Sequence, residues 1–229
     1  MNKKITHLDL GVSEYKITWD RQEELMKEII DIKLVNKKLL ESEQKETPNY
    51  LIFVEHPHVY TLGKSGDEHN LLLNYIQLQA KEATFFKTNR GGDITYHGPG
   101  QLVGYPIFDL ENFGIGLREY IYSIEEAIVR TIAEYGLVGK RDPNATGVWL
   151  DVGKPTARKI CAIGVKSSRF VTMHGFALNI NTDLDYFKHI NPCGFVDKGV
   201  TSLEKELGIK QNLEIVKNQV LSHFRQIYI

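Results

Sequence analysis

Two side chains of this sequence are suited to covalent chemistry, Cys193 and Lys159. Cys193 lies in the run INPCGF, where Pro192 restricts the residue before it and Gly194 leaves the thiol uncrowded. Lys159 precedes an uncharged run, ICAIG, so we expect its ammonium at the edge of an apolar pocket, where desolvation lowers the pKa of a lysine. A thiol acts as a nucleophile in its thiolate form, and a neutral lysine is a base that could generate it. The pair therefore indicates nucleophilic catalysis.

Both residues also have an ordinary structural interpretation. A free cysteine is usually buried and inert, and Cys161, inside the apolar strand KICAIGV, fits that description well. A lysine at the start of a strand is most often a solvated charge. On residue type alone these interpretations stay open.

The densest glycine cluster is RGGDITYHGPGQ, residues 90–101. Glycines let the backbone approach a ligand closely, and the interleaved Arg, Tyr and His supply polar contacts at the same place. The segment predicts the wall of a binding pocket; the alternative is a tight hairpin whose glycines serve only the turn. Neither GxxxxGK[ST] nor GxGxxG occurs, so no motif supports nucleotide binding.

The histidines give a weaker indication. His56 and His58 are two residues apart, and two such ligands alone do not make a zinc site, so we expect no metal. His97 and His174 each precede a glycine at the edge of a predicted strand. They could contact a substrate or bond neighbouring backbone, and His97 is the better candidate for substrate contact.

One segment, residues 139–169, carries a local excess of positive charge. It holds seven basic residues against the two acids Asp142 and Asp151. Such a region could receive an acidic protein, or it could be a solvated strand face with no partner. The basic residues are Lys140, Arg141, Lys154, Arg158, Lys159, Lys166 and Arg169.

The composition of the 229 residues is that of a globular protein, with 42% hydrophobic and 25% charged residues. A formal net charge of −1 gives no global attraction to nucleic acid or anionic membranes, and we expect neither as a partner. Two cysteines are too few for a secreted disulfide framework, which favours a reducing cytoplasm. The start of the chain lacks the apolar core of a signal peptide, and no apolar run approaches 18 residues, so we expect neither export nor a membrane span.

The elements that must position these residues follow from periodicity. Residues 4–12 indicate a strand and 13–46 a long helix, with Ser13 as N-cap and Pro48 as the stop. Short β-rich runs bounded by Gly, Pro, Asn or Asp follow as far as residue 110, with a helix near 72–82.

The second half of the chain continues this pattern. An amphipathic helix is predicted over 116–135, closing at Gly136, and a final helix around 213–227, with strands between them. We therefore expect an α+β fold, a mixed and mostly antiparallel sheet flanked by helices. No linker divides the chain, which favours one domain over 1–229, although about 190–229 could form a small subdomain.

Taken together, these segments resemble the lipoyl(octanoyl) transferases. The resemblance rests on motifs in the family's order and spacing, and it covers all but the first 50 and last 25 residues closely. It implies the fold of the biotin and lipoate protein ligases. The motifs are TLGKSGDEHNLL at 61–72, RGGDITYHGPGQLVGYPIFDL at 90–110, TGVWL at 146–150, RKICAIGVK at 158–166, HGFALNIN at 174–181 and INPCG at 190–194.

The resemblance also implies roles for residues. Cys193 would hold the acyl group as a thioester, and Lys159 would lower the pKa of that thiol and pass protons. Cys161 departs from the small apolar residue that is usual in the family, and we expect no catalytic role for it. The implied acyl-binding residues are Arg90, Gly91, Gly92, Asp93, Ile94, Thr95, Tyr96, His97, Ala162, Ile163, Gly164, Gly175, Phe176 and Ala177.

The implied reaction moves an octanoyl group from octanoyl-acyl carrier protein to a lysine of lipoyl domains, those of 2-oxoacid dehydrogenases and of the glycine cleavage H protein. A thioester donor already carries the energy of acyl transfer, so we expect ping-pong kinetics with no ATP and no cofactor. Two alternatives remain: an ATP-dependent lipoate or biotin protein ligase, which needs no cysteine, and a non-catalytic module that binds acyl carriers.

Overall fold

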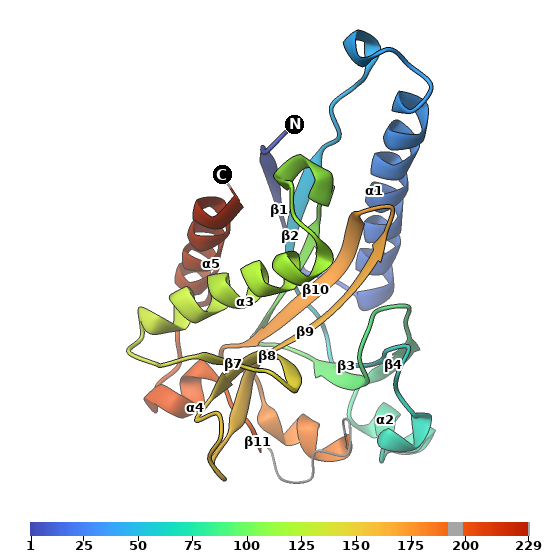
Figure 1. The fold of residues 1–229 in the computed structure, drawn as a ribbon. Coiled ribbons are helices and arrows are strands. Elements are labelled where there is room, and N and C mark those ends of the chain that lie inside the picture. Colours follow the sequence, from blue (N-terminus) through green and yellow to red (C-terminus); the bar gives the residue numbers. More distant parts are fainter. Residues whose placement is uncertain (192–198, 229) are drawn as a thin grey trace.

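In the described part of the chain the main sheet has eight strands, and most of its pairings are antiparallel (Figure 1). The computed structural model describes residues 1–191 and 199–228. Only β1 with β2 and β9 with β11 pair in parallel within this sheet, in the part of the chain that is described. The strands in spatial order are β1 (Ile5–Val12), β2 (Asn49–Glu55), β6 (Gln101–Ile107), β10 (Val171–Asn179), β9 (Arg158–Ser168), β8 (Ala145–Leu150) and β7 (Lys140–Asp142), with β11 (Gly199–Val200) beside β9.

A second, three-stranded sheet lies beside the first. Its central strand β3 (Val59–Leu62) pairs in parallel with β4 (Thr84–Lys87) and antiparallel with β5 (Ile94–His97). The short helix α2 (Tyr75–Ala80) precedes β4, and Asn74 caps it by accepting a hydrogen bond from the Gln77 N–H at 3.0 Å.

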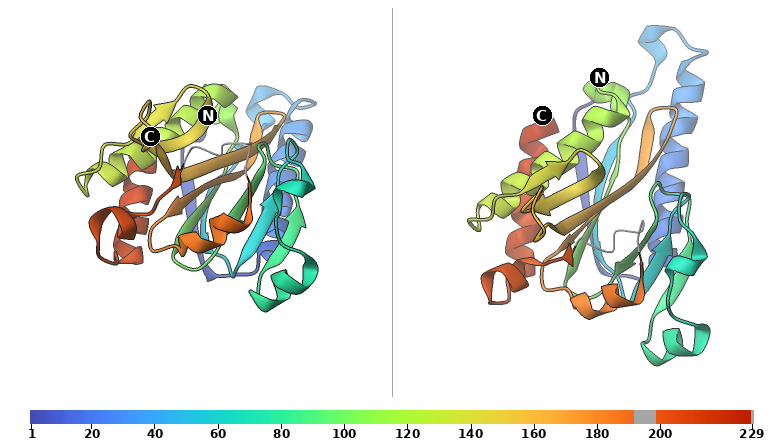
Figure 2. Two further views of the ribbon diagram at one scale, coloured as in Figure 1. Left: turned by 90° about the horizontal axis from the view of Figure 1, so that it is seen from below. Right: turned by 60° about the horizontal axis from the view of Figure 1, so that its bottom comes forward.

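Helices cover both faces of the main sheet. Helix α1 (Tyr15–Asn36) packs on one face, with Leu25, Met26 and Ile29 in a core that includes β2, β6 and β10. Helices α3 (Leu117–Ala133), α4 (Leu203–Leu207) and α5 (Leu213–Tyr228) pack on the other (Figures 1 and 2). Side chains of a strand alternate between faces, so the central strands β2, β6 and β10 contribute to both cores. The observed architecture confirms the α+β prediction.

The long helix predicted over 13–46 is wrong in its extent. The helix begins at Tyr15 and ends at Asn36, with no side-chain cap. Ser13 accepts a hydrogen bond from the Thr18 hydroxyl at 3.2 Å and does not cap the first turn. Asn36 ends the helix because its side-chain amide bonds the backbone N–H and C=O of Lys45, at 3.0 and 2.7 Å, and so holds the returning chain.

The other predicted helices are all present in the structure. The helix near 72–82 is shorter than predicted, and α3 and α5 lie where the periodicity placed them. Gly136 follows α3 at φ +76°, a left-handed conformation that favours glycine. Helix α4 was not predicted from the sequence. No helix in the described residues is long and apolar enough to cross a membrane.

Candidate active site

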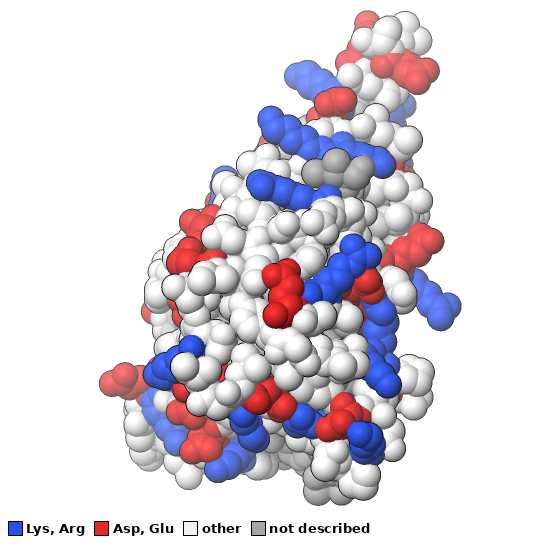
Figure 3. Space-filling model, turned by 90° about the vertical axis from the view of Figure 1, so that its left-hand side faces the viewer, with Lys and Arg blue, Asp and Glu red and all other residues white. Residues whose placement is uncertain are grey.

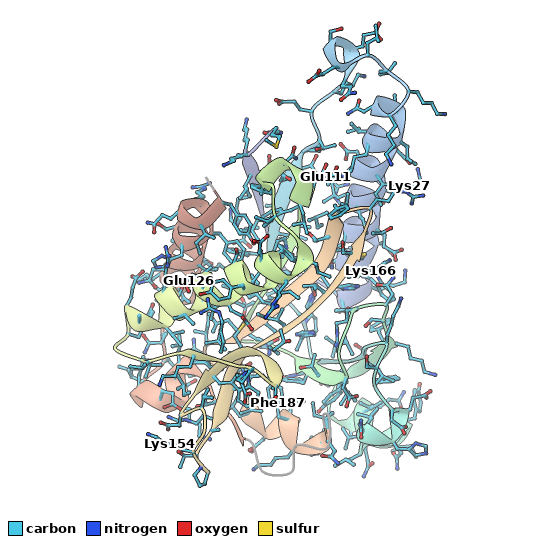
Figure 4. All side chains as sticks on the ribbon, in the orientation of Figure 1. Lys27, Glu111, Glu126, Lys154, Lys166 and Phe187 are labelled. Carbon is cyan, nitrogen blue, oxygen red and sulfur yellow. The ribbon has the colours of Figure 1, made fainter. Side chains whose placement is uncertain are left out.

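A cavity of about 730 Å³ lies where the motif segments meet. Its walls come from parts of the chain that are distant in sequence: the glycine-rich segment before β5, strand β8, and strands β9 and β10. Leu117 and Ile121 of α3 close one side, and Tyr15, at the start of α1, also lines it. Phe187, labelled in Figure 4, reaches the cavity from the turn before the undescribed segment.

Nearly every residue that the resemblance assigned to acyl binding lines this cavity. Tyr96 does not. Its neighbours Thr95 and His97 face the cavity, so strand alternation turns Tyr96 to the other side of β5. There its hydroxyl lies 2.7 Å from Nδ1 of His58, and its ring stacks on Tyr186. The residues that do line the cavity are Arg90, Gly91, Gly92, Asp93, Ile94, Thr95, His97, Ala162, Ile163, Gly164, Gly175, Phe176 and Ala177.

An irregularity in β9 aims Lys159 into the cavity. Val148 of β8 pairs with Cys161, but the next residue, Trp149, pairs with Lys159, so one extra residue is inserted in β9. In a regular strand Lys159 and Cys161 would share a face. The bulge separates them: Cys161 lies in the core and Lys159 lines the cavity. Bulges of this kind re-aim side chains beside active sites.

The side chain of Lys159 rests on its neighbours in β8. Its Nζ lies 4.6 Å from the centroid of the Trp149 ring, a cation–π arrangement. The indole N–H of Trp149 donates to the Ala145 carbonyl at 2.8 Å, which fixes the ring. The sequence motif TGVWL therefore supplies a platform for the lysine.

Cys193 lies outside the described residues. The flanking residues that are described, Asn191 and Gly199, both line the cavity. Val200 pairs with Lys159 in parallel, and the next backbone N–H, that of Thr201, donates to the Lys159 carbonyl at 3.0 Å. The described chain on both sides of Cys193 is thus anchored at the cavity that Lys159 enters.

Three comparisons with known proteins bear on this arrangement. The family of the lipoyl protein ligase A/B catalytic domain matches residues 15–225. An octanoyltransferase of Flavobacterium psychrophilum is 61% identical over 100% of this chain and 98% of its own. The chain belongs to the octanoyltransferase family. A second octanoyltransferase, of Christiangramia forsetii, is 58% identical over 100% of this chain and 97% of its own.

Solved structures agree with this family at the level of the fold. A bi-partite lipoate protein ligase of Thermoplasma acidophilum superposes with a TM-score of 0.69 at 16% identity, over 98% of this chain and 83% of that one. A biotin protein ligase of Aquifex aeolicus gives a TM-score of 0.51 at 13% identity, over 99% and 71%. The octanoyltransferase family assignment and the ligase-like fold are therefore both confirmed.

The second thiol of this octanoyltransferase family member is inaccessible. Cys161 is fully buried, and burial raises the pKa of its thiol well above the usual value. A buried thiol with a raised pKa is inert toward acyl donors. The interpretation of Cys161 as core packing is confirmed.

A chain of buried amides lines one wall of the cavity. Nδ1 of His97 donates to Oε1 of Gln101 at 2.8 Å, and Nε2 of Gln101 donates to Oδ1 of Asn179 at 2.9 Å. Asn179 in turn donates to the carbonyl of Thr201 at 2.9 Å, beside Lys159. Because the Gln101 oxygen only accepts, His97 carries its proton on Nδ1 and presents Nε2 as an acceptor. Gln101 and Asn179 were not singled out from the sequence, although amides inside apolar strands were the available signal.

Three histidines around the cavity are buried and neutral. Desolvation lowers the pKa of His56 to about 4, and the pKa values of His97 and His174 to about 3. His174 also holds φ at +57°, and its Nδ1, buried at the cavity, has no hydrogen-bond partner. No group of three or more metal-binding side chains occurs among the residues that the structure describes.

The buried histidines predict an acid-sensitive fold. Their folded pKa values lie below the unfolded value of 6.5, so the unfolded chain binds more protons and stability falls as pH falls from about 6.5. We expect a loss of about 2 kcal/mol per histidine between about pH 6.5 and pH 5. Urea unfolding at both pH values measures it. His56→Gln should reduce the loss by about a third and exposed His69→Gln should not; equal stability at both pH values would contradict the assignment.

The predicted basic region is partly neutralised by its own surroundings. Arg158 pairs with Asp151 and, at 2.6 Å, with Glu206, while Arg141 pairs with Glu126 at 2.6 Å. Basic and acidic side chains also lie interspersed over much of the face shown in Figure 3. Docking of an acidic protein on this region remains a prediction. It depends on the basic side chains that do not pair with these carboxylates.

Proposed function

We propose that this enzyme carries an octanoyl group on Cys193 as a thioester, between octanoyl-acyl carrier protein and a lysine of a lipoyl domain, with Lys159 as the acid and base. One observation carries the proposal. The β9 bulge aims Lys159 into a cavity walled by the acyl-binding segments, and Asn191, two residues before Cys193, lines that same cavity.

The partners follow from this chemistry. The acceptors are the lipoyl domains of 2-oxoacid dehydrogenases and the glycine cleavage H protein, and the donor is octanoyl-acyl carrier protein. The Thermoplasma neighbour is described together with its own E2 lipoyl domain, which supports an acceptor of this class. The cytoplasm keeps a free thiol such as that of Cys193 reduced, so we propose that the enzyme acts there.

The first half-reaction loads the enzyme. Neutral Lys159 takes the proton of the Cys193 thiol, and the thiolate attacks the carbonyl carbon of the donor thioester. The bond from that carbon to the sulfur of the carrier breaks as the bond to Cys193 forms. Lys159 then gives its proton to the departing sulfur, which leaves the carrier as a thiol and Lys159 neutral.

The second half-reaction uses the same base. The ε-amine of the acceptor lysine attacks the acyl-Cys193 carbonyl, and neutral Lys159 takes a proton from the attacking nitrogen. The carbon–sulfur bond breaks, the amide forms, and Lys159 returns its proton to Cys193. The first step conserves the thioester energy on Cys193 and the second releases it as the amide forms, so no nucleotide is consumed.

The cavity suits an aliphatic chain. Apolar residues of β9 and β10 line it, among them Ala162, Ile163, Phe176 and Ala177. Burying an eight-carbon chain at about 0.8 kcal/mol per CH₂ contributes on the order of 5 kcal/mol of binding. The length of the cavity then limits which acyl chains the enzyme accepts.

An adduct experiment tests the thioester directly. We expect octanoyl-acyl carrier protein, without any nucleotide, to add one octanoyl group to Cys193, located by peptide mass spectrometry. Cys193→Ser should abolish this adduct, and Cys161→Ala should retain it because that thiol is buried. An adduct-free wild-type enzyme, with transfer that requires ATP, would favour the ligase alternative.

A further inference from the structure

A buried carboxylate lies close to Lys159. Glu125 of α3 is only 7% exposed. Its Oε1 accepts a hydrogen bond from the Gly147 N–H at 3.0 Å, and its Oε2 lies 3.2 Å from Nε of Arg141. Burying a carboxylate is costly unless it is paired and hydrogen-bonded, so these contacts hold it in place.

Gly147 connects this carboxylate to the lysine. It holds φ at +125°, and a Cβ there would lie 2.5 Å from the Cys161 carbonyl oxygen, so the position requires glycine. The same Cβ would lie 3.5 Å from both Cδ and Cε of Lys159. The stem of Lys159 therefore passes directly over Gly147, and the carboxylate of Glu125 accepts a hydrogen bond from the N–H of that same residue.

Other charged and titratable groups surround Lys159. Arg141 of β7 faces Glu125, and it also reaches Glu126 at 2.6 Å. On β9 the thiol of Cys161 is buried, and Arg158 pairs with Asp151 and Glu206. The described residues of β11, Gly199 and Val200, bring no charge, and β8 brings the Trp149 ring. Glu125 is thus a buried carboxylate of α3 that interacts electrostatically with Lys159.

We propose that Glu125 is a positioning residue that sets the proton affinity of Lys159 from the core side of the site. The positive charge of Arg141 offsets part of the negative charge of Glu125. The inference rests on the proposed role of Lys159 as the acid and base. A nearby negative charge stabilises the ammonium form, and Arg141 offsets part of that charge. Consistently, burial raises the pKa of Glu125, while the Gly147 N–H and the charges of Arg141 and Lys159 oppose that rise.

The proposal predicts shifts of opposite sign in two variants. Glu125→Gln keeps an oxygen for the Gly147 N–H and removes the charge, so the pKa of Lys159 should fall by about one unit. Arg141→Gln leaves the carboxylate unopposed and should raise it. Glu119→Gln is the matched control: Glu119 is an exposed carboxylate on α3 that also accepts a hydrogen bond from a glycine, the Gly116 N–H at 2.9 Å.

Two readouts separate this inference from the proposed function. Competitive labelling of lysines against pH, read by peptide mass spectrometry, reports the pKa of Lys159 whether or not it is catalytic, with exposed Lys27 as internal reference. The acidic limb of kcat/KM against pH reports the essential base. We expect both to move down for Glu125→Gln, up for Arg141→Gln, and not at all for Glu119→Gln.

The outcomes are distinct. A shifted labelling pKa with an unmoved acidic limb supports the role of Glu125 and counts against Lys159 as the base. An unmoved labelling pKa in Glu125→Gln overturns the inference, even if the rate falls, because a purely structural role changes rates without changing the proton affinity of Lys159. Equal shifts in the Glu125 and Glu119 variants overturn it as well.

Discussion

Replacing Lys159 by methionine is expected to lower kcat/KM for octanoyl transfer by about 10²- to 10⁴-fold, the range of a lost general acid and base. Methionine keeps an unbranched apolar stem over Gly147 and Trp149 while removing the proton carrier. The measurement is the rate at which octanoyl-acyl carrier protein modifies a lipoyl domain, followed by mass spectrometry.

Lys154 provides the matched control. It lies five residues upstream, is exposed, and pairs with Asp151 at 3.1 Å on the surface (Figure 4). Lys154→Met should stay within about twofold of wild type because exposed ion pairs contribute little. Similar rates for Lys159→Met and the wild type would remove Lys159 from the mechanism. If Cys193→Ser is also fully active, the enzyme does not work through this pair at all.

Truncating Phe224 to alanine is expected to destabilise the whole protein by about 3–5 kcal/mol. Phe224 of α5 is fully buried and stacks on Phe176, a wall residue of the cavity, with ring centroids 5.6 Å apart. The same core holds Ile5 from the start of the chain and Tyr228 from its end. We therefore propose that residues 1–229 form one catalytic domain. We expect the wild type and Phe224→Ala each to show a single unfolding transition in urea.

The control for Phe224→Ala is a substitution at Ile215, which lies on the same helix, α5, and is 54% exposed. Ile215→Ala should change the free energy of unfolding by no more than about 0.5 kcal/mol. Two separate transitions, with the Phe224 variant affecting only one of them, would instead show that residues 190–229 form a subdomain of their own.

The periodicity of the sequence was sufficient for most of the fold. Strands and amphipathic helices carry their own repeat, so α3 and α5 could be located to within a few residues. The end of α1 could not. Residues after Asn36 remain compatible with helix in composition, and the helix ends because Asn36 bonds Lys45 across a turn, a contact between residues nine apart. Such tertiary contacts leave no local signature.

The site was predictable where one segment supplies a wall. Glycines and polar residues of 90–97 do line the cavity, apart from Tyr96. The orientation of Lys159 could not be read from RKICAIGVK, because regular alternation would give it the same face as Cys161. Only the pairing of β9 with β8 shows the inserted residue. The burial of Glu125 could not be predicted either, because it lies on a helix whose other buried side chains are mostly apolar packing residues.

The acyl-enzyme itself offers the most direct test. Octanoyl-enzyme is isolated free of donor, mixed with a lipoyl domain in the absence of nucleotide, and quenched at short times. We predict that the octanoyl group leaves Cys193 and appears on the acceptor lysine at a rate no slower than kcat. An adduct that stays on the enzyme while the overall reaction turns over would show that Cys193 is a side product and would contradict the account.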